Sequence, residues 1–230
     1  MIAYARAALD LLWPPLCPRC GARADAPRDH FCERCWSSLR AATVEPADTP
    51  VHCAFSVDAL FLDVLATSKY RRFRRVGLRL AREAAARLSA SVPEGVCVPV
   101  PLTGAKRRER GFNQTEDVAD ALCHAARAAN RELVVDARLL RRTKGGKALA
   151  GKAPEVRAAA VRHAFVADPR VAELGVILVD DVVTTGSTLR ECTRAIETAG
   201  GRVLAWVAMG RAGGAASDVP ALRRETLGNL

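Results

Sequence analysis

Aromatic side chains are scarce in this sequence of 230 residues, where Phe, Trp and Tyr together make up only 5%. Grooves that stack nucleic-acid bases on successive rings need more of them, so an extended stacking surface is not expected. Long hydrophobic runs are also missing, and none approaches the ~20 residues that span a bilayer. The apolar start, MIAYARAALDLLWPPLC, lacks a charged leader and a small-residue cleavage site. It fits a short amphipathic helix that ends at Pro14-Pro15, and we expect a cytoplasmic protein.

The net charge is +10, and it is distributed unevenly along the chain. Residues 69–112 carry 12 Lys and Arg against 3 acids, and residues 138–162 carry 8 against 1. Basic side chains can simply lie on solvated faces. Their local concentration also fits a polyanionic partner, either a polyphosphate ligand or a nucleic acid. The composition leaves both interpretations open.

Four of the eight cysteines form two CxxC pairs: Cys17, Cys20, Cys32 and Cys35. This spacing brings four thiolates together and predicts a structural Zn²⁺ site, with disulfides as the weaker alternative. Gly21 can take the positive φ that a zinc knuckle needs after its second ligand. His30 could replace a ligand but is better explained as a loop residue. The other cysteines are isolated and are predicted to be small core residues: Cys53, Cys97, Cys123 and Cys192.

Beyond the cysteines, strand and helix patterns alternate, which predicts an α/β fold with a mainly parallel sheet. Residues 54–66 and 76–91 have helical spacing. Strands are expected at 96–102, 132–140, 162–167, 175–181 and 202–212, with helices at about 114–129 and 187–199. We expect three parts: an N-terminal helix and zinc ribbon (1–45), the sheet domain (46–214) and a tail (215–230).

The stretch VILVDDVVTTGSTL places two adjacent aspartates, Asp180 and Asp181, at the end of a buried strand. Like charges at such a position resist burial, which indicates that a ligand satisfies them. The loop that follows, 184–188, offers hydroxyls, amides and a helix N-terminus, all of which suit a phosphate. A ribose 5-phosphate explains both the acids and the loop. A polar turn with an aspartate at a helix cap is the simpler alternative.

This string resembles the 5-phosphoribosyl-1-pyrophosphate (PRPP) motif of type I phosphoribosyltransferases. Further stretches narrow the resemblance to the ComF/GntX family: CxxCG…CxxC, Lys69-Tyr70, VPVPL, RERGFNQ, and RHAF before the PRPP strand. Together they cover nearly the entire chain. The resemblance implies a type I phosphoribosyltransferase fold with a small N-terminal zinc ribbon, and a link to natural transformation.

The resemblance also implies roles for residues of this chain. Asp180 and Asp181 would bind the ribose hydroxyls of PRPP, directly or through Mg²⁺, and Arg110 would neutralise the pyrophosphate. Phe112 would stack on a base or fill the core, and the core role is favoured. The implied PRPP-binding set is Lys69, Pro101, Leu102, Asp180, Asp181, Val182, Val183, Thr184, Thr185, Gly186, Ser187 and Thr188. The implied catalytic set is Asp180, Asp181, Arg110, Lys144 and Lys147.

Residues 141–161 correspond to the mobile lid of these enzymes, where Lys144 and Lys147 suit closure over a pyrophosphate leaving group. This lid departs from the family pattern. It has Arg157, but Ala160 stands where an Asn is usual, and the loop contains no Gln. The departure bears on catalysis more than on PRPP binding.

Two functions follow from these observations. The chain could be a phosphoribosyltransferase, a glycosyltransferase that displaces pyrophosphate from PRPP, in DNA uptake or nucleotide-related metabolism. For that reaction His163 and His124 are weak candidates as general base. Alternatively, the chain could be a non-catalytic module that senses PRPP and binds single-stranded DNA or competence and DNA-processing proteins.

Overall fold

The structure is a computed structural model that describes residues 14–24, 30–42, 50–70, 73–143 and 164–212. The strands are β1 (Val51–Ser56), β2 (Gly95–Pro99), β3 (Leu133–Val135), β4 (Leu140–Arg142), β5 (Phe165–Ala167), β6 (Gly175–Val183) and β7 (Arg202–Arg211). The helices are α2 (Glu33–Ser37), α3 (Ala59–Ser68), α4 (Arg74–Leu88), α5 (Gly104–Arg110), α6 (Gln114–Ala128) and α8 (Ser187–Thr198), with a 3-10 turn at Pro169–Val171. Within these ranges, none of the helices combines the length and the apolar character needed to cross a membrane.

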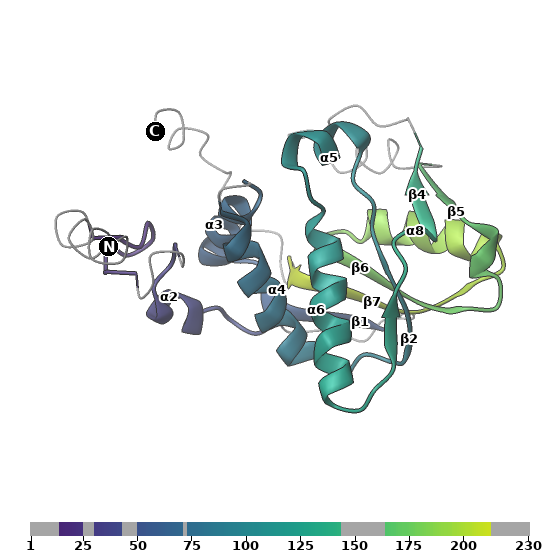
Figure 1. Ribbon diagram of the computed structural model, residues 1–230, viewed down its shortest axis with the longest axis horizontal. Coiled ribbons are helices and arrows are strands. Elements are labelled where there is room, and N and C mark those ends of the chain that lie inside the picture. The colour runs from purple at the N-terminus through teal and green to yellow at the C-terminus, as the bar shows by residue number, and fades with distance from the viewer. Residues whose placement is uncertain (1–13, 25–29, 43–49, 71–72, 144–163, 213–230) are drawn as a thin grey trace, which may run out of the picture.

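A five-stranded sheet in the order β1-β7-β6-β2-β3 forms the centre of the molecule, and all of its pairings are parallel (Figure 1). Its middle strand, β6, is fully buried from Val176 to Val179, as expected for a strand covered on both faces. One core, with α3, α4 and α6, covers one face. A second core, with α8 and the β4–β5 hairpin, covers the other. The predicted α/β fold with a mainly parallel sheet is confirmed.

The chain reverses its direction of travel across the sheet between β2 and β6. From β2 the chain passes through α5 and α6 to β3 at one edge, whereas from β6 it passes through α8 to β7 on the other side. These two crossovers lie on opposite faces of the sheet. The connections that leave β2 and β6 therefore diverge and open a crevice at the carboxyl ends of these strands, where open α/β sheets bind ligands.

Three expectations from the sequence need correction. The stretch 54–66 is not one helix, because Val51–Ser56 is an edge strand that pairs with β7, and the helix starts only at Ala59. The expected strand 132–140 is two short strands, separated by a turn in which the Asp136 side chain accepts a hydrogen bond from the Arg138 amide at 2.8 Å. The expected parallel strand at 162–167 is a three-residue strand that pairs antiparallel with β4 in a separate hairpin. The predicted helix before Pro14 lies outside the described residues.

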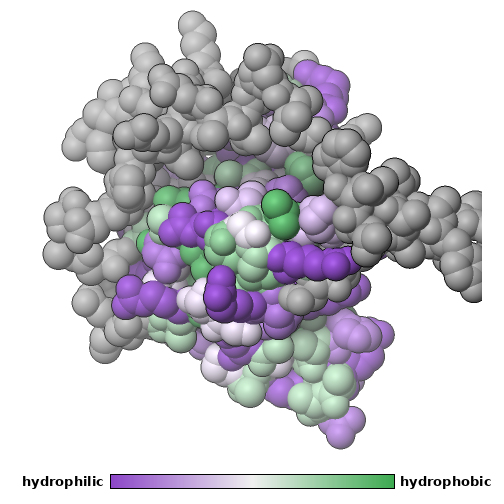
Figure 2. All heavy atoms as spheres, turned by 90° about the vertical axis from the view of Figure 1, so that its left-hand side faces the viewer, coloured by the Kyte–Doolittle hydropathy of each residue, from purple (hydrophilic) through white to green (hydrophobic). Residues whose placement is uncertain are grey.

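The cysteine-rich segment packs directly on the helical layer. Phe31 and Trp36 are buried in the same core as α3 and α4. The Arg79 guanidinium of α4 lies 4.6 Å from the centre of the Trp36 ring and pairs with Glu33. Figure 1 shows α2 beside these helices, and Figure 2 shows hydrophilic and hydrophobic residues interspersed on this side of the molecule. The segment therefore completes the core of the sheet domain.

Candidate functional site

The connection from β6 to α8 forms a small hollow that suits an anion. Its lining includes Thr184, Gly186, Ser187 and Thr188, directly after the strand. Gly186 has a φ of +70° and its Cα lies so close to the Trp206 ring that an added Cβ would meet a ring carbon at 3.1 Å. Because α8 starts at Ser187, its first amides have no partners within the helix and face this hollow. The loop predicted to hold a phosphate therefore lines a hollow at the N-terminus of α8.

The two aspartates lie inside β6 instead of after it. They occupy the part of β6 that extends beyond the end of its neighbour β2. The last pairing with β2 is Val179 with Pro99, whereas β6 continues to pair with β7 as far as Val183. Beyond Val179, one edge of β6 is therefore free of the β2 strand. This places Asp180 and Asp181 at the mouth of the crevice between β2 and β6.

Neighbouring residues on a strand point to opposite faces of a sheet, which separates the two carboxylates. Leu178 packs in the core with α8, and Val179 packs in the core with α3, α4 and α6. By the same alternation, Asp180 lies on the α8 face, where it lines the anion hollow. Asp181 lies on the other face. The pair thus offers one carboxylate to each side of the crevice.

A different cation faces each aspartate. Arg142 in β4 interacts electrostatically with Asp180, and the half-buried Lys69, at the end of α3, interacts most strongly with Asp181. Burial, followed by the charge of Asp181, raises the pKa of Asp180 to about 8, although the Asp181 amide donates a hydrogen bond to its carboxylate at 2.8 Å. Burial also lowers the pKa of Lys69. Burial of Asp180 and Lys69 is therefore unfavourable in the free protein. A ligand that offers both hydroxyls and negative charge would reduce this unfavourable free energy.

The loop that leaves β2 is fixed by the start of α6. The Val100 carbonyl accepts hydrogen bonds from the Asn113 side-chain amide at 3.1 Å and from the Thr115 hydroxyl at 2.9 Å. The Val100 amide donates to the carbonyl of Val179 in β6 at 2.8 Å. The following residues, Pro101 and Leu102, therefore start from a fixed backbone beside the aspartates. Both residues belong to the PRPP-binding set that the family resemblance implies.

The RGFNQ string links this loop to Lys69. Gln114 donates a hydrogen bond to the buried Ser68 hydroxyl at 2.5 Å, which fixes the end of α3 against the start of α6. The Arg110 side chain donates to Gln114 at 3.4 Å, and its charge acts on Lys69. Phe112 is only 7% exposed, with the Arg74 guanidinium 5.2 Å from its ring centre. Phe112 therefore fills the core, which was the favoured interpretation.

Arg142 is a site residue that sequence reasoning missed. Its Nε atom is buried and has no hydrogen-bond partner among the described residues, and its guanidinium lies 5.0 Å from the Phe165 ring centre. Burial lowers its pKa. The sequence carries many basic residues around this position, so only burial distinguishes Arg142 from the others. The alternation of the short strand Leu140–Arg142 was a weak signal that its side chain points inwards.

Other predicted residues are not brought to this site. His124 lines a groove between α4 and α6 on the outer surface of the helical layer, and therefore does not act as a base at the sheet edge. Lys144, Lys147 and His163 lie outside the described residues, as does most of the expected lid.

The four cysteines of the CxxC pairs do come together, with all sulfur atoms within 4.8 Å of one another. Two of the separations are 3.8 Å (Cys17 to Cys35) and 3.5 Å (Cys20 to Cys32), close to the ~3.8 Å expected around tetrahedral zinc with bonds of about 2.3 Å. Hydrogen bonds from the Ala22 amide and the Arg34 side chain lower the pKa of Cys20 to about 6, which favours the thiolate. The donor set fits a structural Zn²⁺ ion.

Local geometry supports the same interpretation of the cysteine cluster. Gly21 has the expected positive φ, at +70°. His30 packs against Phe73, with ring centres 4.4 Å apart, and is not part of the cluster. The remaining cysteines are all buried, as predicted: Cys53, Cys97, Cys123 and Cys192.

Two family models match this chain. A family model described as phosphoribosyl transferase domain matches residues 74–218, and one described as double zinc ribbon domain matches residues 8–47. The chain is 29% identical over 188 residues to the DNA utilization protein YhgH of Salmonella typhi. It is 28% identical over 189 residues to the protein of the same name from Salmonella typhimurium strain LT2. Each alignment covers 76% of this chain and 75% of the relative.

Solved structures are more distant. One, described as an analysis of an invariant aspartic acid in HPRTs in its glutamic acid mutant, shares 19% identity with a TM-score of 0.35. The alignment covers 64% of this chain and 73% of that chain.

Proposed function

Because the chain belongs to the phosphoribosyl transferase domain family, we propose that it binds PRPP, together with Mg²⁺, at the carboxyl ends of β2 and β6. One observation carries the proposal: the aspartates occupy the point where β6 outlasts β2, and an anion-binding loop follows at once. A phosphate site alone would exclude carboxylates. A site for a phosphorylated sugar needs both, since the acids accept hydrogen bonds from hydroxyls.

Each side of the crevice then takes a different part of the ligand. On the α8 face, the 184–188 loop would hold the 5′-phosphate while Asp180 accepts from a ribose hydroxyl. On the other face, Lys69 and Arg110 would neutralise the pyrophosphate beside the loop at Pro101. Carboxylate and phosphate oxygens suit Mg²⁺, which would reduce charge repulsion between the acids and the pyrophosphate.

We propose pyrophosphate displacement as the reaction, with the protein acting mainly through position and charge. Loss of pyrophosphate leaves positive charge on the ribose ring, which the carboxylate of Asp181 and, once it is ionised, that of Asp180 would stabilise. The departing anion is stabilised by Lys69 and Arg110. None of the histidines among the described residues lines the anion hollow, and His124 lies in the groove between α4 and α6.

The YhgH relatives and the joined zinc ribbon support assignment to the ComF/GntX family and a role in DNA uptake. A non-catalytic sensor of PRPP that engages single-stranded DNA is the second candidate. It is favoured by α5, which has no buried residue and exposes Lys106 and Arg108 next to the crevice. Both are in position to contact a nucleic-acid backbone.

Calorimetric titration of PRPP with Mg²⁺ tests the proposal. Wild-type protein is expected to bind, and the double variant Asp180→Asn/Asp181→Asn is expected to lose binding. The control is Asp63→Asn/Glu83→Gln, which removes two carboxylates from α3 and α4, away from the crevice. Absence of PRPP binding by the wild type, or equal binding by the aspartate variant, would overturn the proposal.

Two further measurements separate the candidate activities. Release of pyrophosphate from PRPP, followed with a panel of nitrogen acceptors, identifies an enzyme. Salt-dependent binding of single-stranded DNA that weakens in Lys106→Gln/Arg108→Gln supports the sensor.

A further inference from the structure

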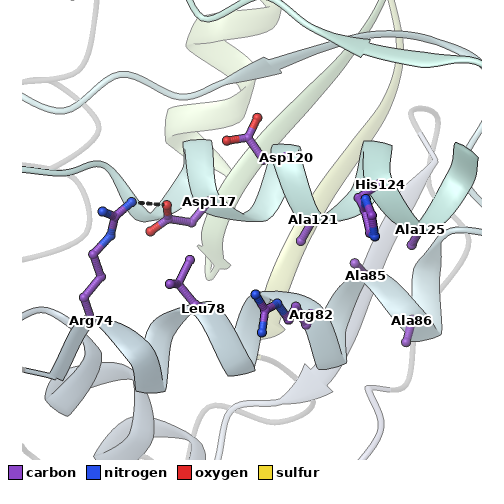
Figure 3. Close-up of a pocket in the computed structure, with 10 residues that line it drawn as sticks. All are labelled: Arg74, Leu78, Arg82, Ala85, Ala86, Asp117, Asp120, Ala121, His124 and Ala125. Atoms are coloured by element: carbon purple, nitrogen blue, oxygen red, sulfur yellow. Dashed lines mark hydrogen bonds and ion pairs between the residues drawn. The ribbon is translucent and has the colours of Figure 1, made fainter.

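A groove of about 690 Å³ runs between α4 and α6, on the side of these helices that faces away from the sheet (Figure 3). Apolar and mostly short side chains line it: Leu78, Ala85, Ala86, Ala121 and Ala125. Because alanine side chains are short, a helix of another molecule can approach the backbone closely here. The groove shares no lining residue with the anion hollow at the end of β6. It is therefore a second surface, separate from the proposed PRPP site.

The two walls of the groove carry opposite charge. Arg74 and Arg82 belong to the α4 wall, whereas Asp117 and Asp120 belong to the α6 wall. At one end the walls already neutralise each other, through the 2.8 Å ion pair of Arg74 with Asp117. In the middle they do not: Arg82 and Asp120 are both exposed, and among the described residues neither forms an ion pair or side-chain hydrogen bond.

The acidic wall is short of positive charge. One carboxylate oxygen of Asp117, Oδ2, is buried and accepts no hydrogen bond from a described residue. Partial desolvation of its carboxyl, together with the charges of Asp117 and Glu116, raises the pKa of Asp120. A cation brought against this wall would therefore be attracted to it, and phosphate groups of a nucleic acid would be repelled.

We propose that this groove is the interface of a homodimer, in which α4 of each copy packs over α6 of the other. A two-fold axis along the groove exchanges the two walls while it preserves the direction of the helices. Arg82 lies level with Asp120 along the helix pair (Figure 3). The axis therefore places Arg82 of each copy opposite Asp120 of the other, so that two new ion pairs form.

The charges of the two walls favour this arrangement over one with a two-fold axis across the helices. A two-fold axis across the helices would place Arg82 against Arg82 and the acidic walls against each other. A different protein would have to supply a basic and an acidic stripe at the same spacing, whereas a second copy carries both. Like-charge pairs across an interface are strongly unfavourable, so the walls set the register as well as the partner.

Sedimentation of the full chain at increasing concentration tests the proposal. Wild-type protein is expected to dimerise. Arg82→Glu and Asp120→Arg are each expected to raise the dimer dissociation constant about a hundredfold, because symmetry repeats one like-charge pair twice and each costs about tenfold. Arg202→Glu, an exposed reversal at the start of β7, is the matched control and is expected to leave the constant unchanged.

Mixing the two single variants gives the decisive result. In a heterodimer of Arg82→Glu with Asp120→Arg, both cross-interface pairs again join opposite charges, and dimerisation is expected to return. Recovery on mixing also shows that the variants are folded, as does an unchanged near-ultraviolet circular dichroism spectrum. A monomeric wild type at all concentrations, variants that remain dimers, or the absence of rescue between folded variants would each overturn the proposal.

Discussion

Replacing Asp180 by asparagine is expected to stabilise the free protein while it abolishes PRPP binding. The wild-type carboxyl has a pKa raised to about 8, because it is buried and lies beside Asp181. In the unfolded chain it ionises near its ordinary value of about 4. Between these values the native state holds a proton that the unfolded state has released, so stability falls as pH rises from about 4 to about 8. Asparagine does not titrate, so the Asp180→Asn variant does not show this fall in stability as the pH rises.

The magnitude follows from the same linkage. One proton gives a maximum slope of about 1.4 kcal/mol per pH unit. The Asp180 side chain is only partly buried, and Arg142 lies on the same face of the sheet. Water and this cation therefore reduce the total loss of stability as the pH rises. We expect Asp180→Asn to be about 2 kcal/mol more stable than wild type at pH ~8 and nearly equal to it at pH ~4.

Urea denaturation across this pH range provides the measurement, in buffer without Mg²⁺ and without a chelator that would remove zinc. Asp63→Asn is a suitable control, since that exposed carboxylate on α3 pairs with Arg19 at the surface. The wild type and the control should lose stability in parallel as pH rises, whereas Asp180→Asn should lose less. Identical pH slopes for all three proteins would refute the assignment of a buried, protonated Asp180.

Three other changes have defined outcomes. Gly186→Ala should cost about 1–2 kcal/mol of unfolding free energy in urea, because a side chain at φ +70° is strained and its Cβ would meet Trp206 at 3.1 Å; PRPP binding by calorimetry should also weaken. Asn113→Ala should lower the unfolding free energy in urea by about 1 kcal/mol, because α6 loses its N-cap. It should also weaken PRPP binding by calorimetry about tenfold, because the Val100 carbonyl is released. Removal of zinc, checked by metal analysis, should lower the melting temperature of the whole chain in one transition, because Trp36 is buried in the core of the sheet domain; a separate low-temperature transition would contradict this.

The sequence predicted the parts of the fold that depend on local pattern. The buried strand predicted at 175–181, the amphipathic helix predicted at 76–91 and the CxxC spacing all depend on neighbours in the chain. It failed at Val51–Ser56 because an edge strand is defined by its pairing, here with β7, whose Trp206 pairs with Val51 from a distant part of the sequence. Short strands such as Phe165–Ala167 carry too few residues to show which partner they will choose.

The sequence likewise predicted some residues of the candidate site and missed another. The aspartates and their loop were visible as a string, and the resemblance located Arg110 and Lys69. The separation of Asp180 and Asp181 onto opposite faces also follows from strand alternation, once the strand is known to continue to Val183. Arg142 could not be selected, because its role comes from burial beneath Asp180 and not from sequence spacing.

Because α5 has no buried residues, its sequence can evolve more freely than that of the neighbouring elements. The seven residues from Gly104 to Arg110 are fixed at their ends, by the Thr103 cap at the start and by Gly111 at φ +76° after the last residue. Substitutions on the exposed turns between those ends cost little stability. Mutation can therefore alter the charge presented at the rim of the crevice while the residues that hold the sugar phosphate stay in place. A lineage could acquire or lose a macromolecular partner at α5 without rebuilding the domain beneath it.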